Sequence, residues 1–254
     1  MSAHRTVRIG TAGWAIGAAF RNRFPAQGTS LQRYATRLAA VEINSSFHRP
    51  HRPATYARWA GSVPDDFRFA TKVPRAITHD ARLANCDDLL SAFAAECGAL
   101  GAKLAVILVQ LPPSLAFDPA MAAFFAGVAG HFDAAIACEP RHASWFEGEV
   151  DAWLAERRIA RVAADPARHR HAGEPGGWRG LTYYRLHGSP VIYRSSYDDA
   201  AITDMAGQLA ADAAPERWCI FDNTASSAAL GNALDLGAPE RLNLFLAPPP
   251  ALRR

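Results

Sequence analysis

Eight short apolar segments alternate with helix patterns along this 254-residue chain, and this alternation constrains its fold more than any other feature. The short segments lack a helical period and are typical of strands buried on both faces, whereas apolar residues recur at helical spacing between them. Such alternation predicts a parallel sheet covered by helices, and eight strand–helix units predict a (β/α)₈ TIM-type barrel. The expected strands are Val7–Thr11, Ala40–Asn44, Arg68–Lys72, Leu104–Val109, Ala134–Glu139, Ile159–Ala164, Thr182–His187 and Trp218–Asp222.

One stretch departs from this alternation. Residues 167–180 are rich in Gly, His and Arg and show no helical period, so we expect an irregular crossover between the sixth and seventh strands. A doubly wound open sheet is the alternative fold, but it would leave edge strands, and no short polar segment suited to an edge is found. No linker divides the chain, which predicts a single domain over residues 1–254.

The composition limits function only broadly. No span approaches the roughly 20 apolar residues that cross a bilayer, and the N-terminal residues have no compact apolar block, so we expect a cytoplasmic protein without a membrane partner. The four cysteines form no C-x-x-C pair, which predicts buried, reduced thiols. The net charge of +3 is mild, but only Lys72 and Lys103 among the 27 basic residues are lysines. These two stand out, because arginine could serve any site that needs only a positive charge.

Polar or ionisable residues end almost every predicted strand, and in parallel barrels these ends meet at one mouth. The fifth strand is the clearest case, because its apolar run ends at Glu139 and Pro140 cannot donate to a sheet ladder. Inert ion pairs could explain any one of these residues, but burying charge at every strand end costs free energy without a return in function. The strand-end residues are Thr11, Glu42, Asn44, Lys72, Gln110, Glu139, Asp165, Arg185, His187, Asp222 and Asn223.

Seven motifs resemble those of the YecE-like family, the domain of unknown function seventy-two, and they occur in the family's order over nearly the whole chain. The resemblance implies a TIM-type barrel and no established reaction. The chain departs from the family pattern at three positions. It has His48 where Tyr is usual, Pro140 where Phe or Met is usual, and Asp222 where Asn is usual. The family pattern therefore implies no role for Asp222. The motifs are Ile9–Trp14, Val41–Phe47, Phe69–His79, Gln110–Pro113, Glu139–Trp145, Arg185–Gly188 and Phe221–Thr224.

The first functional hypothesis is an enzyme that acts on a small anionic or polyhydroxy substrate at the barrel mouth. Cationic side chains would bind its negative end, with Glu139 or Asp165 as base and His187 or His142 as acid. Gly188–Ser189 and the loop 224–226 lie where barrels often hold phosphate. The candidate catalytic residues are Glu42, Lys72, Glu139, Asp165 and His187. The candidate substrate-binding residues are Trp14, Asn44, Phe47, Arg75, His79, Gln110, Arg141, His142, Trp145, Arg185, Gly188 and Asn223.

A metal-assisted version of this hypothesis uses four residues from consecutive strands. Their carboxylates and imidazole would form a divalent-metal site like those of barrel sugar isomerases and epimerases. Strand ends need not point at a common ion, so the metal stays an alternative, and no other cofactor is expected. The candidate ligands are Glu139, Asp165, His187 and Asp222.

Two other classes of function stay open. Aromatic residues expected on the rim alternate with arginines, a pattern that binds unpaired nucleic-acid bases, although the same aromatic residues could simply close the barrel top by packing. A ligand sensor without catalysis is the third class. The run Arg168–His171 is expected to be a solvated surface turn. The residues of the rim pattern are Trp14, Phe47, Trp145, Tyr197, Arg49, Arg52, Arg75 and Arg141.

Overall fold

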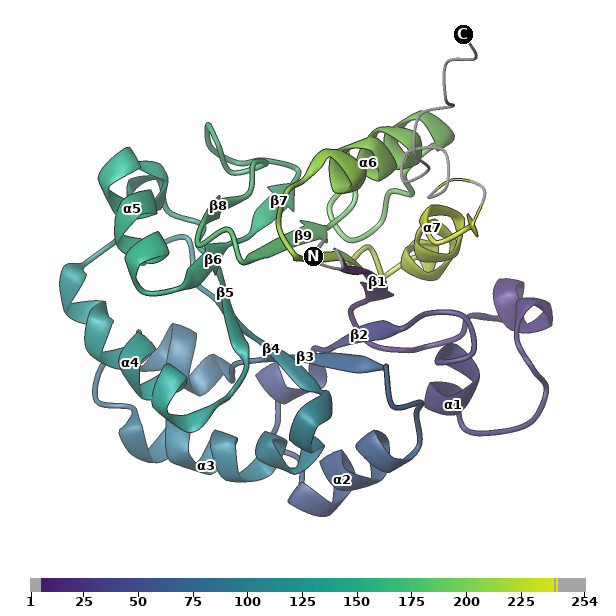
Figure 1. Cartoon of the computed structure of the whole chain (residues 1–254), viewed down its shortest axis with the longest axis horizontal. Coiled ribbons are helices and arrows are strands. Elements are labelled where there is room, and N and C mark those ends of the chain that lie inside the picture. The colour runs from purple at the N-terminus through teal and green to yellow at the C-terminus, as the bar shows by residue number, and fades with distance from the viewer. Residues whose placement is uncertain (1–5, 240, 242–254) are drawn as a thin grey trace, which may run out of the picture.

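The structure is a computed structural model, and it describes residues 6–239 and residue 241. The strands lie around the centre of the molecule and the helices lie outside them (Figure 1). The predicted alternation is therefore confirmed. The strands are β1 (Thr6–Thr11), β2 (Ala40–Ile43), β3 (Arg68–Lys72), β4 (Leu104–Gln110), β5 (Ala135–Glu139), β6 (Ile159–Arg161), β7 (Ala163–Asp165), β8 (Gly176–Gly177), β9 (Leu181–Leu186) and β10 (Glu216–Phe221). The α-helices are α1 (Ser30–Tyr34), α2 (Pro53–Gly61), α3 (Asp87–Cys97), α4 (Ala122–His131), α5 (Gly148–Glu156), α6 (Asp199–Ala211) and α7 (Ala228–Leu236).

Short helical turns follow several strands. They matter because they carry residues from the strand ends toward the outer helices. The turns are η1 (Ala18–Arg23), η2 (Ser45–Phe47), η3 (Ala76–Asp80), η4 (Gly98–Lys103), η5 (Pro119–Met121) and η6 (Ala143–Phe146).

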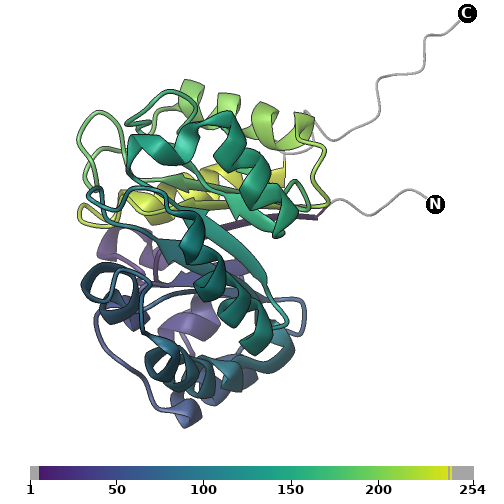
Figure 2. The same ribbon diagram turned by 90° about the vertical axis from the view of Figure 1, so that its left-hand side faces the viewer.

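The strands of the described residues form two sheets. One has the order β1-β10-β9-β7 and the other the order β2-β3-β4-β5-β6-β8. All neighbours are parallel except β8, which pairs antiparallel with β6. Figure 2 shows the first half of the chain below and the second half above. No continuous hydrogen-bonded ladder within residues 6–239 and 241 joins all the strands into one closed sheet.

The two sheets nevertheless approach each other at both junctions. Only Val162 separates β6, which pairs with β5, from β7, which pairs with β9. At the other junction Ala12 bridges to Glu42, and the N–H of Gly13 donates to the Glu42 carbonyl at 2.8 Å. A side chain at Gly10 would begin 2.2 Å from the Ala40 carbonyl oxygen, so this close contact requires glycine.

Alternation along the strands sorts their side chains into an inner and an outer core. The outer core packs the strands against the helices. The inner core contains residues of both sheets, and Tyr183 and Trp218 stack within it with ring centroids 5.7 Å apart. Its buried members are otherwise small or aliphatic: Ala40, Ala70, Val106, Leu108, Ala137, Ala160, Val162, Leu181 and Ile220.

Caps and backbone conformation set the local boundaries of the helices. Thr29 caps α1, because its side chain accepts from the Gln32 N–H in a capping box. Helix α3 begins two residues after Asn85, whose left-handed φ of 49° places it outside the helix. The crossover at residues 167–180 is irregular as predicted, although it contributes the short strand β8.

Two composition-based predictions can be compared directly with the structure. All four cysteines are free and buried, which confirms the expected reduced thiols. None of the helices in the part of the chain that the structure describes is long and apolar enough to cross a membrane.

Candidate functional site

A buried ion-pair network centred on Arg185 lies at the carboxyl ends of the strands. Arg185 is fully buried, and its Nε and Nη2 donate to the two carboxylate oxygens of Glu42 at 3.0 and 2.7 Å. Its Nη1 donates to Glu139 at 2.5 Å, and Nη2 also donates to Asp222 at 3.0 Å. These partners come from β2, β5 and the residue after β10, so one guanidinium ties together strands of both sheets.

Glu139 accepts hydrogen bonds from several side chains besides Arg185. Arg141 donates to its Oε1 at 3.2 Å, Gln110 donates to its Oε2 at 3.2 Å, and the Nε2 of His187 lies 3.1 Å from Oε1. Burial alone would raise the pKa of Glu139, but the charges of Arg185, His187 and Arg141 outweigh burial and hold this pKa well below its usual range. A carboxylate with so low a pKa is a weak base.

His187 bridges two carboxylates. Its Nδ1 lies 3.0 Å from Asp222, and its Nε2 contacts Glu139. A neutral imidazole donates from only one nitrogen, so both contacts are satisfied at once only by the protonated ring. Burial lowers the pKa of His187, but the two carboxylates overcome this effect and raise the pKa above its ordinary value.

Lys72, at the end of β3, is the least satisfied charge of the site. It is 5% exposed, and its Nζ lies 4.0 Å from the centroid of the Phe47 ring. Among the described residues its Nζ makes no hydrogen bond or ion pair. Burial, followed by the charge of Arg185, lowers the pKa of Lys72 to about 8, although the three carboxylates of the network act in the opposite direction.

The charges of this site do not cancel. Four groups are cationic when His187 is protonated, whereas three are carboxylates, so one positive charge is left over. The excess lies near Lys72 and the partly exposed Arg141, since Arg185 is enclosed by its partners. The site therefore favours an anion. The cationic groups are Lys72, Arg141, Arg185 and His187, and the carboxylates are Glu42, Glu139 and Asp222.

Asp165 does not join this network, contrary to the expectation from its place at a strand end. Ala163, two residues earlier in β7, belongs to the outer core. Residues two apart in a strand lie on the same face, so Asp165 also faces outward. Its Oδ2 accepts a hydrogen bond from the Tyr197 hydroxyl at 2.6 Å. The structure thus uses Asp165 to anchor the segment before α6.

The predicted metal site is not assembled for the same reason. Glu139, His187 and Asp222 come together, but both ring nitrogens of His187 contact carboxylates and the fourth expected ligand, Asp165, faces away. No group of three or more potential ligands within residues 6–239 and 241 is arranged to hold a metal ion. Arginine occupies the centre that the metal would require, so the residues present do not fit a divalent cation.

Several expected binding residues have structural roles instead. Trp145 is fully buried and its indole N–H donates to the Leu115 carbonyl at 3.0 Å, so it packs in the core. The imidazole of His142 accepts from the Ser144 N–H and caps η6. Trp14 packs edge-on against Trp59 at a centroid distance of 5.0 Å.

The two expected phosphate loops are also occupied by contacts within the chain. The N–H of Gly188 donates to the Tyr197 hydroxyl, and the N–H of Ala225 donates to the Tyr193 carbonyl. Asn223 donates to the Ser195 carbonyl at 2.9 Å and pins the same segment. These donors therefore stabilise the loops rather than face an open site.

The remaining candidates lie around Lys72 and Phe47. The His79 ring packs against Phe47 at 5.1 Å, and burial and the charges of Arg75, Lys72 and Arg141 lower the pKa of His79. Arg75 is exposed and pairs with Asp80 at 3.3 Å. The side-chain oxygen of Asn44, which follows β2, is buried and has no hydrogen-bond partner in the part of the chain that the structure describes.

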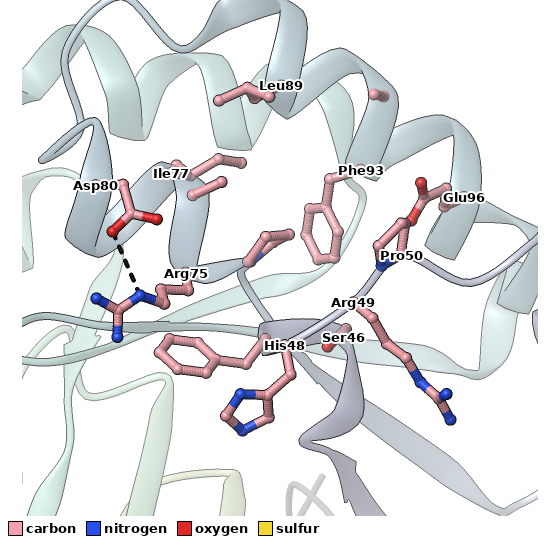
Figure 3. Close-up of a pocket in the computed structure, with 14 residues that line it drawn as sticks. Ser46, His48, Arg49, Pro50, Arg75, Ile77, Asp80, Leu89, Phe93 and Glu96 are labelled. Atoms are coloured by element: carbon pink, nitrogen blue, oxygen red, sulfur yellow. Dashed lines mark ion pairs between the residues drawn. The ribbon is translucent and has the colours of Figure 1, made fainter.

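A cavity of about 380 Å³ opens beside this group, between η2, η3 and α3 (Figure 3). Phe47 lines it, and Ile77 and Phe93 make its walls apolar, while Arg75 and Asp80 pair at one side. A second cavity, of about 20 Å³, lies against Glu139 and is large enough only for a water molecule. A third cavity, of about 350 Å³, lies against Arg141 and His142, so there is space for a larger ligand beside Phe47 and beside Arg141.

Two tyrosines of the site were not identified from the sequence. The Tyr183 hydroxyl donates to Glu42 at 2.9 Å, and period-2 alternation from Arg185 would have placed it on the same face. Tyr193 packs edge-on against His187 with centroids 5.8 Å apart, and it has a left-handed φ of 68°. No local sequence signal points to Tyr193, because its position depends on the fold of the loop after β9.

The comparisons with known proteins agree with the motif resemblance. The UPF0759 protein YecE of Escherichia coli (strain K12) is 32% identical over 154 residues, which are 58% of this chain. That match spans only 56% of the length of this relative.

Solved structures extend the likeness to nearly the whole chain. The DUF72 family protein EF0366 of Enterococcus faecalis V583 has a TM-score of 0.76 at 22% identity, with 94% of this chain and 96% of that chain covered. The DUF72 family protein TM1631 of Thermotoga maritima MSB8 has a TM-score of 0.72 at 21% identity, with 91% and 97% covered. At these identities the likeness establishes a shared fold. The family model described as "Protein of unknown function DUF72" matches residues 8–250, and the chain therefore belongs to the DUF72 family.

Proposed function

We propose that the two sheets form one closed (β/α)₈ barrel, and that this protein is an enzyme for acid/base chemistry on a small anionic or polyhydroxy molecule at its mouth. The barrel is supported by the near continuity of β6 and β7 through Val162 and by the bridge between Ala12 and Glu42. The enzyme is supported by one observation: Lys72, whose Nζ makes no hydrogen bond or ion pair among the described residues, lies beside a buried network whose other charges are fixed by hydrogen bonds.

A purely structural network is a poor explanation of this arrangement. Arg185 and its three carboxylates satisfy one another, so they could stabilise the fold alone. Lys72 adds a largely buried charge without a hydrogen bond or ion pair among the described residues, and the Phe47 ring and the carboxylates of the network only partly offset the cost of burying it. Such incompletely compensated burial is typical of a group kept for chemistry.

The geometry suggests a division of roles within the site. Lys72 would exchange a proton or attack the substrate, because its lowered pKa makes the free amine available near neutral pH. His187 would act as the acid once one of its two N–H groups leaves its carboxylate partner, and the partly exposed Arg141 would bind the anionic group. Glu139 has too low a pKa for the base role considered from the sequence, so it would hold Arg141 and His187 in place.

Nucleic-acid binding is less well supported by these contacts. Trp145 is buried, Trp14 packs on Trp59, and the Tyr197 hydroxyl is engaged by Asp165. Of the aromatic residues expected to stack on bases, only Phe47 then remains among the described residues, and Lys72 already contacts its ring face. We therefore keep nucleic acid as an outcome of the test.

Isothermal titration calorimetry with inorganic phosphate and with glycerol 3-phosphate tests the proposed anion site. We expect saturable binding that weakens about tenfold or more in Lys72→Met and Arg141→Gln, because each removes one positive charge from the mouth. Arg23→Gln is the matched control, since Arg23 pairs with Asp235 on the surface, away from the network. Absent binding, or equal losses in the control, would overturn the proposal. Binding only of a single-stranded oligonucleotide, with steep salt dependence, would replace it with nucleic-acid binding.

A further inference from the structure

We infer that Lys72 forms a covalent imine with the carbonyl carbon of a small anionic aldehyde or ketone. The inference rests on the proposed function and names its substrate class: the anion that the mouth binds would carry a carbonyl group within reach of the Lys72 amine. Catalysis would then proceed through a covalent intermediate rather than by proton transfer alone.

The surroundings of Lys72 suit a nucleophilic amine. An ammonium that only binds charge is normally fixed by acceptors, and Lys103 is such a case in this chain, because its Nζ donates to the carbonyls of Ala60 at 2.8 Å and Val63 at 2.7 Å. The Nζ of Lys72 has no acceptor among the described residues and lies over the Phe47 ring, although the residue is almost fully buried. Its lone pair, once the proton leaves, is therefore not committed to another group.

Burial also favours the neutral form of this amine. Because the pKa of Lys72 is lowered to about 8, a substantial share of the side chain is uncharged in mildly alkaline solution, whereas an ordinary lysine is almost fully protonated there. The neighbouring Arg185 cannot take this role, since its guanidinium stays protonated and is enclosed by carboxylates.

The covalent step balances with groups of the site. The neutral Lys72 amine attacks the carbonyl carbon, forming a C–N bond, and the proton that this nitrogen then releases passes to the carbonyl oxygen to give a carbinolamine. One N–H of the His187 imidazolium leaves its carboxylate partner and donates its proton to the hydroxyl, which leaves as water. The product is a protonated imine on Nζ, and its positive charge faces the carboxylates that already surround the site.

The space beside Lys72 limits the size and charge of the substrate. Phe47 contacts the Lys72 ammonium and also lines the cavity of about 380 Å³, although Lys72 itself does not line that cavity, and the third cavity, of about 350 Å³, lies against Arg141. Arg141 is one-fifth exposed and supplies a cation for a carboxylate or phosphate group. The chemistry therefore points to a 2-oxo acid or a phosphorylated aldehyde or ketone.

Reductive trapping tests the inference directly. The full chain is incubated at pH 8 with pyruvate, glyoxylate or dihydroxyacetone phosphate, sodium cyanoborohydride is added to reduce any imine to a stable secondary amine, and adducts are located by peptide mass spectrometry. The chain suits this assay because Lys72 and Lys103 are its only lysines. We expect one dominant adduct on Lys72, retained in Lys103→Arg and lost in Lys72→Arg, which keeps the charge but has no nucleophilic amine.

The outcomes separate this inference from the proposed function. Glycerol 3-phosphate binding that persists in the wild-type protein, with none of the three probes trapped on Lys72, overturns the imine while the anion site stands. Adducts that appear equally on Lys103 and the terminal amine also overturn it, because they report unselective reaction. Melting curves of Lys72→Arg and Lys72→Met establish that the loss of the adduct is not a loss of fold. Failure of both phosphate binding and trapping removes both proposals.

Discussion

Replacing Arg185 with methionine is the sharpest test of the network. The change leaves the carboxylates of Glu42, Glu139 and Asp222 buried without the guanidinium that serves all three. Removing one partner of a single buried pair costs about 3–5 kcal/mol, so with three orphaned carboxylates we expect about 5 kcal/mol or more. For a chain of this size that loss lowers the melting temperature by roughly 10–20 °C. Urea unfolding followed by circular dichroism at pH 7 measures the free energy.

The pH dependence of Arg185→Met provides an independent check. In the wild-type protein the pKa of Glu139 is depressed, so its contribution to stability is present above the unfolded pKa of about 4.3 and is lost as the pH falls. The variant lacks most of this contribution, so its deficit should narrow as the pH falls below about 4.3 toward the depressed pKa of Glu139. Arg23→Met breaks an exposed pair and should cost at most about 1 kcal/mol. A deficit of Arg185→Met below 1 kcal/mol at pH 7, or one that stays constant with pH, would refute the reasoning.

Three further predictions concern His187 and the segment between β9 and α6. The pKa of His187 is raised, so the contribution of His187 to stability is full below the unfolded pKa of about 6.5 and is lost as the pH rises through the folded pKa. NMR of the imidazole should place the titration midpoint of His187 above about 6.5. A midpoint at or below this value would contradict the bridge between Glu139 and Asp222. Gly188→Ala should destabilise by about 1–3 kcal/mol in urea unfolding, because φ is 94° and the added carbon would lie 2.8 Å from the Ser195 carbonyl; an unchanged midpoint would exclude this strain. Tyr197→Phe should cost about 1–3 kcal/mol, since it removes the donor to Asp165, and a deficit no larger than that of Arg23→Met would show this contact to be unimportant.

Strand positions were predictable because burial on both faces leaves a clear sequence pattern. β3 was expected with the bounds observed, and β5 was expected to within one residue. The polar residue at each strand end was also evident, so Glu139, Lys72 and His187 could be named before the fold was known. The local sequence therefore specifies which residues lie at the carboxyl ends of the strands.

The sequence could not specify which face each strand-end residue occupies. Asp165 follows apolar residues on both faces of its strand, so nothing local distinguishes the inner from the outer side, and the structure turns it toward Tyr197. The enclosure of Arg185 was equally inaccessible, because its partners come from three other strands distant in sequence. Arg185, a cation expected to bind substrate, is therefore the structural centre of the network, whereas the Nζ of Lys72 makes no hydrogen bond or ion pair among the described residues.

The composition of the chain strengthens the case that Lys72 serves chemistry rather than charge. Arginine is used at nearly every basic position, and at Lys103 the compact ammonium fits between two carbonyl oxygens that lie within hydrogen-bond distance of it. No comparable acceptors hold Lys72 in the described residues, so hydrogen bonding does not explain why an ammonium stands there. An arginine guanidinium could also stack on Phe47, and the positive charge of Arg185 would repel it no more than it repels Lys72. A guanidinium at this position could not lose its proton, however. The property that lysine alone supplies at this position is a neutral amine, and a reaction that uses this amine is the simplest account of its presence.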